Sequence, residues 1–138
     1  MKKVISFGEI MMRLNPHGYL KLRQAQDLKV SFAGGEANVA VSVANFGMKS
    51  EFVSKLPDND LGHMAEQELR KYAVDTGHMI YGGPRLGVYY VEKGASQRPS
   101  KVLYDRANSS IALARTEDFD WEEILDGCIV KLVLQPLL

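Results

Sequence analysis

The chain has 138 residues, of which 46% are apolar and 25% charged, a balance typical of one globular domain with a sizeable core. Because 17 Lys and Arg residues are matched by 17 Asp and Glu residues, the chain has no net positive charge that would favour a nucleic-acid partner or an acidic membrane surface. The single cysteine, Cys128, excludes an internal disulfide framework, and no apolar run approaches the ~20 residues of a membrane span, so a cytoplasmic protein is predicted.

Two patterns typical of strands open the chain. Residues 4–7 form a short apolar run that closes at Gly8, as buried strands of parallel sheets do. Ligands usually bind at the loops that follow the ends of such strands. Residues 27–32 alternate apolar with polar side chains, which predicts a strand with one covered face and one solvated face.

Helical spacing of apolar residues follows over residues 36–46, and Gly47 is expected to end that helix. Residues 50–55 then have the pattern of another strand, and Asp60 is placed to cap a second helix. The apolar residues that would form one face of this second helix are Leu61, Met64, Ala65, Leu69 and Tyr72. The alternation of strands and helices predicts an α/β fold built on a parallel sheet.

Two β-rich runs, residues 86–93 and 101–106, are joined by a short polar loop with no helix between them. They are therefore predicted to pair antiparallel as a hairpin, which would form a lid beside the main sheet. The adjacent residues Tyr89 and Tyr90 would place one ring on each face of this hairpin. After the hairpin, Asp120 is placed to cap a short last helix.

The segment with the most chemical information lies between the edge strand and the first helix and contains Gly34, Gly35 and Asn38. Paired glycines let the backbone approach a ligand and expose N–H groups at the helix start, while an Asn can donate to and accept from hydroxyl groups. That chemistry suits a sugar. On spacing alone, an ordinary glycine turn remains an open alternative. The segment has neither the third glycine of a dinucleotide-binding loop nor the Gly-Lys-Ser/Thr ending of a P-loop.

Together with four further motifs, this segment resembles the first signature of the ribokinase (PfkB) family of carbohydrate kinases. The other motifs lie at residues 8–14, 61–62, 87–89 and 104–109, and the last is similar to 2-keto-3-deoxygluconate kinases in particular. The resemblance covers residues 1 to about 127. It implies the N-terminal part of a doubly wound, ribokinase-like α/β sheet with a small antiparallel β lid at about residues 86–106.

For the full-length family, the resemblance implies ATP-dependent and Mg²⁺-dependent phosphorylation of a sugar or sugar acid such as 2-keto-3-deoxygluconate. The substrate contacts that it implies at matching positions are Gly34, Gly35, Asn38, Tyr89, Tyr104 and Arg106. An independent argument supports Arg106, because a guanidinium forms a fork suited to a carboxylate. Taken by itself, Arg106 could also be a solvated surface charge. Glu9 could touch a substrate hydroxyl or act as a structural acceptor, and it stays outside the predicted site.

The family's second signature, a glycine-rich segment with an aspartate that acts as general base, has no match in this sequence. No catalytic residue is therefore assigned, and the C-terminal, ATP-binding half of the family is expected to be absent. The chain alone is expected to bind neither ATP nor Mg²⁺. It is also expected to lack kinase activity, because phosphoryl transfer depends on the general base, the metal ion and the groups that bind the phosphates. Residues 128–138 are predicted to form a divergent tail. The histidines lack metal-ligand spacing and are expected at the surface, so no metal site is predicted; they are His17, His63 and His78.

Two other interpretations stay open. The chain could be a non-catalytic sugar-binding or dimerisation module, in which the exposed edge of the lid forms a homodimer. It could also be an unrelated α/β nucleotide-binding domain, which the lack of either phosphate-loop motif disfavours.

Overall fold

The main sheet of the protein is parallel and has its first strand at the centre. A computed structural model describes residues 2–133, with side chains described up to residue 129, and the part of the predicted tail beyond residue 133 lies outside these residues. In spatial order, the strands are β4 (Ser50–Val53), β1 (Lys3–Phe7) and β9 (Cys128–Val133). Both neighbours of β1 run parallel to it, which confirms the buried parallel strand expected at residues 4–7.

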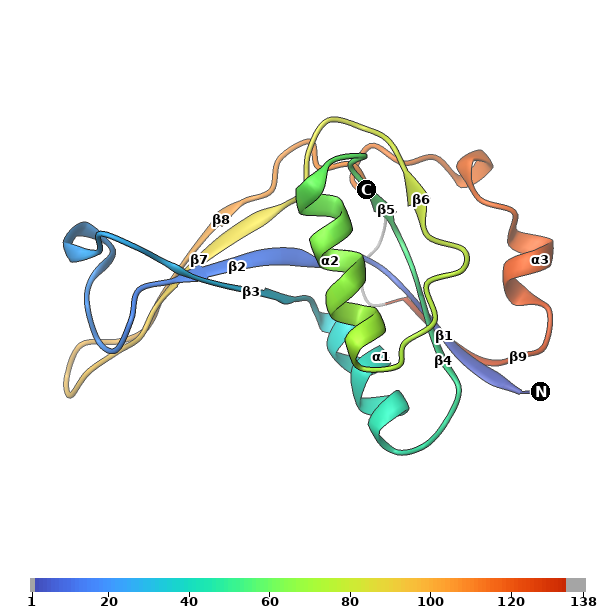
Figure 1. Cartoon of the computed structure of the whole chain (residues 1–138), viewed down its shortest axis with the longest axis horizontal. Helices are drawn as coiled ribbons and strands as arrows, with labels where there is room; N and C mark the ends of the chain where they lie inside the picture. The colour runs from blue at the N-terminus through green and yellow to red at the C-terminus, as the bar shows by residue number, and fades with distance from the viewer. Residues whose placement is uncertain (1, 134–138) are drawn as a thin grey trace.

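Two longer helices lie side by side near this sheet (Figure 1). α1 (Gly35–Asn45) packs against β1 and β4, and α2 (Asp60–Lys71) shares a hydrophobic cluster with it. The cap of α2 is Asn59, whose side chain accepts the backbone N–H of Gly62 at 3.1 Å, so the prediction of Asp60 as cap is wrong by one residue. A short third helix, α3 (Trp121–Leu125), begins after Asp120, whose carboxylate accepts the N–H of Glu123 as predicted.

The apolar face predicted for α2 is too wide. Ala65 and Leu69 are buried in the core, whereas the other three predicted members, Leu61, Met64 and Tyr72, are each about 40% exposed. The buried stripe consists instead of Gly62, Ala65 and Leu69, at helical spacings of three and four residues. The buried position 62 requires a glycine, because a Cβ there would collide with the backbone carbonyl of Pro57.

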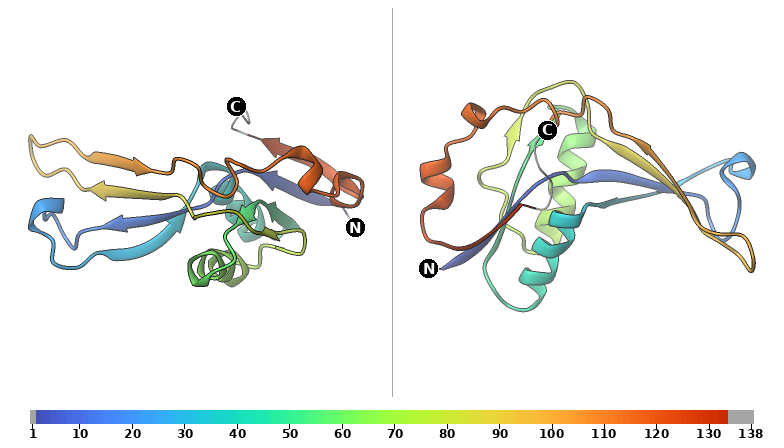
Figure 2. Two further views of the ribbon diagram at one scale, coloured as in Figure 1. Left: turned by 90° about the horizontal axis from the view of Figure 1, so that it is seen from above. Right: turned by 180° about the vertical axis from the view of Figure 1, so that it is seen from behind.

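A second sheet projects from the body of the molecule as a lid (Figure 1, and seen from above in Figure 2). In spatial order, its strands are β3 (Lys29–Ala33), β2 (Met11–Asn15), β7 (Val88–Glu92) and β8 (Lys101–Asp105). β7 and β8 pair antiparallel, which confirms the predicted hairpin. The strand β2 was not predicted, because its residues include no β-branched or aromatic side chain. It pairs with both β3 and β7, so the lid sheet extends well beyond the hairpin.

Hydrophobic clusters cover both faces of the main sheet. Phe52 and Val53 are adjacent on β4 and belong to different clusters, as expected when successive side chains point to opposite faces. The larger cluster joins α1, α2 and the start of the lid; its buried members are Ile10, Met12, Ala37, Ala40, Phe52, Leu56, Ala65, Leu69, Val74 and Leu86. The smaller cluster packs under α3; its buried members are Ile5, Phe7, Val53, Ile111, Phe119 and Ile124.

The remaining elements are short. β5 (Lys55–Leu56) pairs parallel with β6 (Ile80–Tyr81), and single turns of 3₁₀-helix form η1 (Leu22–Gln24) and η2 (Thr116–Asp118). The start of the predicted divergent tail, residues 128–133, forms β9 of the main sheet. Across the described part of the chain, no helix has the length and apolar character needed to cross a membrane.

Candidate functional site

The root of the lid is organised around the carboxylate of Glu9, which lies between β1 and β2. The Glu9 side chain is only 7% exposed, and its Oε1 forms an ion pair with Arg106 Nη2 at 2.5 Å. Its Oε2 accepts a hydrogen bond from the Ser109 hydroxyl at 2.7 Å. Arg106 and Ser109 lie where the chain leaves β8. One buried carboxylate therefore joins the segment that enters the lid to the segment that leaves it.

Two glycines allow neighbouring backbone segments to pass close to Glu9, one at its carboxylate and one at its main chain. A Cβ at Gly87 would lie 2.9 Å from Glu9 Oε2 and 3.2 Å from Arg106 Cβ. A Cβ at Gly34 would collide with the backbone carbonyl oxygen of Glu9. Gly34 is therefore required where β3 turns into α1 against the lid root, whether or not a ligand is bound. Its role as a ligand contact stays a prediction.

Beyond the root, the lid presents two stacked tyrosines. Tyr89 of β7 and Tyr104 of β8 are directly opposite, with ring centroids 5.9 Å apart and ring planes inclined by 29°. The guanidinium carbon of Arg106 lies 5.8 Å from the Tyr104 ring centroid, within the range of a cation–π contact. Tyr104 is 64% exposed, so solvent or a ligand can reach it. The structure thus brings together Tyr89, Tyr104 and Arg106, three of the predicted site residues.

The electrostatics of the tyrosine pair involve a further cation. Burial raises the pKa of Tyr89, and the positive charge of Arg13 on the neighbouring strand β2 opposes that shift. The phenol of Tyr89 is therefore protonated at neutral pH and can both donate and accept a hydrogen bond. Such groups recognise the hydroxyls of a polar ligand.

The two remaining predicted contacts lie on α1. Gly35 is the first residue of the helix and is exposed. Asn38 lines a hollow of about 310 Å³ between α1 and α2, together with Phe32, Glu68 and Tyr72 among others. Neither the two stacked tyrosines nor Arg106 lines this hollow. The predicted residues therefore form a lid group and a helix group, and their contacts with a ligand remain predictions.

Glu9 is the residue of this site that the sequence-based prediction left out. Its signal was present, since a carboxylate that directly follows a buried strand stands at the edge of the sheet where ligands bind. Its partner Ser109 is 100 positions away along the chain, and no local pattern pairs the two residues.

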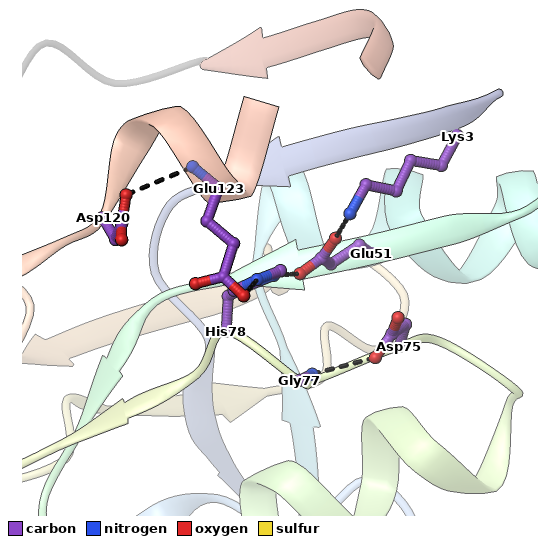
Figure 3. A network of polar contacts seen from close by, with 7 residues as sticks. All are labelled: Lys3, Glu51, Asp75, Gly77, His78, Asp120 and Glu123. Carbon is purple, nitrogen blue, oxygen red and sulfur yellow. Dashed lines mark hydrogen bonds and ion pairs between the residues drawn. The ribbon is translucent and has the colours of Figure 1, made fainter. Parts of the chain in front are cut away.

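A second polar network lies at the opposite, amino-terminal end of the main sheet (Figure 3). The Glu51 side chain on β4 is completely buried and binds both Lys3 Nζ, at 2.5 Å, and Nδ1 of His78. The other ring nitrogen of His78 lies 3.7 Å from Glu123 Oε1 on α3. His78 was expected at the surface, but its side chain is only 24% exposed because the buried carboxylate holds it. The network connects β1, β4 and α3.

His78 is expected to make the stability of the chain depend on pH. Its hydrogen bond to Glu51 raises the pKa of His78 above the usual value of 6.5. The stabilisation is therefore complete below about pH 6.5 and is lost as the pH rises through the raised pKa. Between about pH 6 and pH 8, the free energy of unfolding should fall more in the wild type than in His78→Gln. Urea unfolding at both pH values measures this, and equal changes in the two proteins would contradict it.

Comparisons with known proteins give a consistent result. The pfkB family carbohydrate kinases match residues 1–132. A 2-dehydro-3-deoxygalactonokinase from Haloferax volcanii is 37% identical over 125 residues, which cover 91% of this chain and 39% of that enzyme. A 2-dehydro-3-deoxygluconokinase from Bacillus subtilis is 29% identical over 117 residues, covering 83% of this chain and 36% of the relative. The chain thus spans about two fifths of the length of these relatives.

Solved structures share the fold. The crystal structure of a 2-dehydro-3-deoxygluconokinase from Thermotoga maritima superposes with a TM-score of 0.91 at 52% identity, over 93% of this chain and 39% of that one. A sugar kinase from Pyrococcus horikoshii, solved in complex with ATP, gives a TM-score of 0.77 at 27% identity, over 88% and 39% of the two chains. The predicted ribokinase-like α/β fold is confirmed by these similarities.

Proposed function

Because the chain belongs to the pfkB family of carbohydrate kinases, we propose that it forms the substrate-binding part of a kinase for a keto-deoxy sugar acid such as 2-keto-3-deoxygluconate. The observation that carries this proposal is the lid group of Tyr89, Tyr104 and Arg106, anchored by the buried Glu9. The similarity to kinases of 2-dehydro-3-deoxy sugar acids supports it.

In the proposed site, each lid residue has a separate role. The hydroxyls of Tyr89 and Tyr104 would bind sugar hydroxyls, because a phenol both donates and accepts. Arg106 would attract the acid group, and its ion pair with Glu9 fixes the direction of the guanidinium before the ligand arrives. A preoriented group loses less conformational entropy on binding. These residues bind and orient the substrate, and none is assigned the removal of a proton.

ATP and Mg²⁺ enter the proposal through the family and through the ATP complex of a related sugar kinase. When bound, ATP would supply the phosphoryl group that is transferred to a terminal hydroxyl of the sugar, and Mg²⁺ would neutralise the charge of its phosphates. Among the described side chains, no three His, Cys, Asp or Glu residues form a cluster that could hold a metal ion, so no residue is assigned to these groups. The sequence also has neither phosphate-loop motif. A cytoplasmic location is part of the proposal, supported by the single free Cys128.

Titration calorimetry with 2-keto-3-deoxygluconate and with fructose tests the proposal. We expect the chain to bind the acid sugar and to transfer no phosphate from ATP to either sugar, because the general-base motif has no match. Tyr104→Ala should weaken binding by about tenfold, whereas Tyr19→Ala, at a similarly exposed tyrosine in the loop after β2, serves as the matched control. No binding of the acid sugar would contradict the proposed substrate. ATP turnover by protein free of host kinases would contradict the expected inactivity.

A second candidate function is self-association through the lid. The observation that favours it is an apolar hollow of about 390 Å³ near the tip of the lid, lined by Leu22, Leu28, Tyr90 and Leu103 among others. Leu103 is 43% exposed there. A homodimer would cover this surface, and sedimentation equilibrium of the wild type and of Leu103→Asp distinguishes it from a monomer.

A further inference from the structure

One row of side chains crosses all four strands of the lid. Ser31 lies opposite Arg13, Arg13 beside Tyr89, and Tyr89 opposite Tyr104 in the strand pairing. Directly paired residues project from the same face of a sheet. Arg13 is therefore a central member of the face that presents the two stacked tyrosines.

Arg13 has an unmet capacity for hydrogen bonds. Its Nε is buried and has no hydrogen-bond partner among the described residues. Leaving a buried donor unsatisfied is costly, so such a group in a native protein calls for an acceptor. Arg13 is the direct neighbour of Tyr89 in the strand pairing, and its charge opposes the rise in the pKa of Tyr89 that burial causes. An acceptor at this place would touch Arg13 and Tyr89 together.

The charge of Arg106 is matched within the protein, in contrast to that of Arg13. Arg106 forms its ion pair with the buried Glu9, whereas no ion pair within the described part of the chain includes Arg13. Glu9 thus balances the charge of Arg106, whereas the charge of Arg13 has no ion-pair partner among the described residues. A ligand with one negative charge would balance Arg13.

We propose that Arg13 is a specificity-determining residue that provides the positive charge by which the lid selects acid sugars over neutral ones. This inference rests on the proposed function and deepens it by naming a group that recognises the negative charge of the substrate. Arg13 would donate to the carboxylate of the sugar acid, with Tyr89 beside it as a second donor. Arg106 would act on the same acid group, but its charge is already balanced by Glu9, so it would contribute less to the selection.

The test compares Arg13→Gln, Arg13→Lys and wild type by titration calorimetry with 2-keto-3-deoxygluconate and with fructose. A charge-assisted hydrogen bond corresponds to about a ten- to hundredfold change in affinity, so Arg13→Gln should bind the acid sugar that much more weakly. Its affinity for fructose should stay the same. Arg13→Lys should keep part of the preference for the acid sugar, because lysine keeps the positive charge but cannot donate two parallel hydrogen bonds to a carboxylate. The matched control is Arg23→Gln, at an exposed arginine of η1.

The outcomes separate the inference from the function on which it rests. If the wild type binds the acid sugar and Arg13→Gln binds it equally well, the inference fails and the proposed function stands. If the wild type binds neither sugar, both fail. Equal losses for both sugars would show that Arg13 supports the structure of the lid, which also overturns the inference. Circular dichroism verifies that each variant is folded.

Discussion

Replacing Glu51 with alanine is expected to lower the free energy of unfolding by about 3–5 kcal/mol, the usual cost of removing one partner from a buried ion pair. The Glu51 side chain is completely buried, and it serves both Lys3 and His78. These two side chains are only 19% and 24% exposed, so water could replace the lost carboxylate only in part. The cavity left by the side chain adds to the loss.

Urea unfolding followed by the fluorescence of Trp121 on α3 measures this effect. Glu51→Gln should be intermediate, because it keeps the volume and some of the hydrogen bonds but loses the charge. The control is Asp58→Ala, since the ion pair of Asp58 with His63 is at the surface, with 75% of the Asp58 side chain exposed. That variant should change stability very little. A similarly small loss for Glu51→Ala would show that the cost of burying its charge cancels the attraction.

Arg106→Ala should destabilise the chain by about 3 kcal/mol, because it leaves the carboxylate of Glu9 buried without its cation. The value is at the low end for buried pairs since the Arg106 side chain is 32% exposed. Any loss of affinity for a sugar acid in this variant would therefore combine a missing contact with a disturbed lid root. Selection by charge is tested more cleanly at Arg13.

A double variant isolates the electrostatic part of this loss. Glu9→Gln combined with Arg106→Ala should recover some of the stability, because a neutral amide is less costly to bury than an unpaired carboxylate. Arg85→Ala is the matched control; Arg85 pairs with Asp105 at 2.8 Å, in a more exposed position. Thermal unfolding of the four proteins provides the comparison. A double variant no more stable than Arg106→Ala would place the loss in packing and not in charge.

Elements with a strong local pattern could be predicted from the sequence. The run that ends at Gly8 formed β1, and two β-rich runs joined by a short loop formed the β7–β8 hairpin. The pairing of Tyr89 with Tyr104 follows from that hairpin once its register is known. Local patterns sufficed in these cases because the interactions that define each element lie within a few residues, or across one short loop.

Features that depend on distant contacts could not be predicted. The residues of β2 have weak strand propensity, and that strand exists because β3 and β7 pair with it on both sides. The ion pairs of Glu9 with Arg106 and of Glu51 with His78 join segments that no sequence pattern relates. The position of Asn38 in a hollow apart from the lid group likewise follows from packing between two helices.

The central position of β1 also has a consequence for how the protein folds during synthesis. Ile5 lies beside Glu51 on one side and beside Lys131 on the other, so β1 needs a neighbour that is synthesised much later in the chain. At about 5–20 residues per second, β1 would wait roughly ten seconds for β9. The lid hairpin closes over a short loop and can form earlier, because its loop-closure entropy is small. The pairing of β9 with β1 is therefore expected to follow the lid hairpin and to be limited by translation.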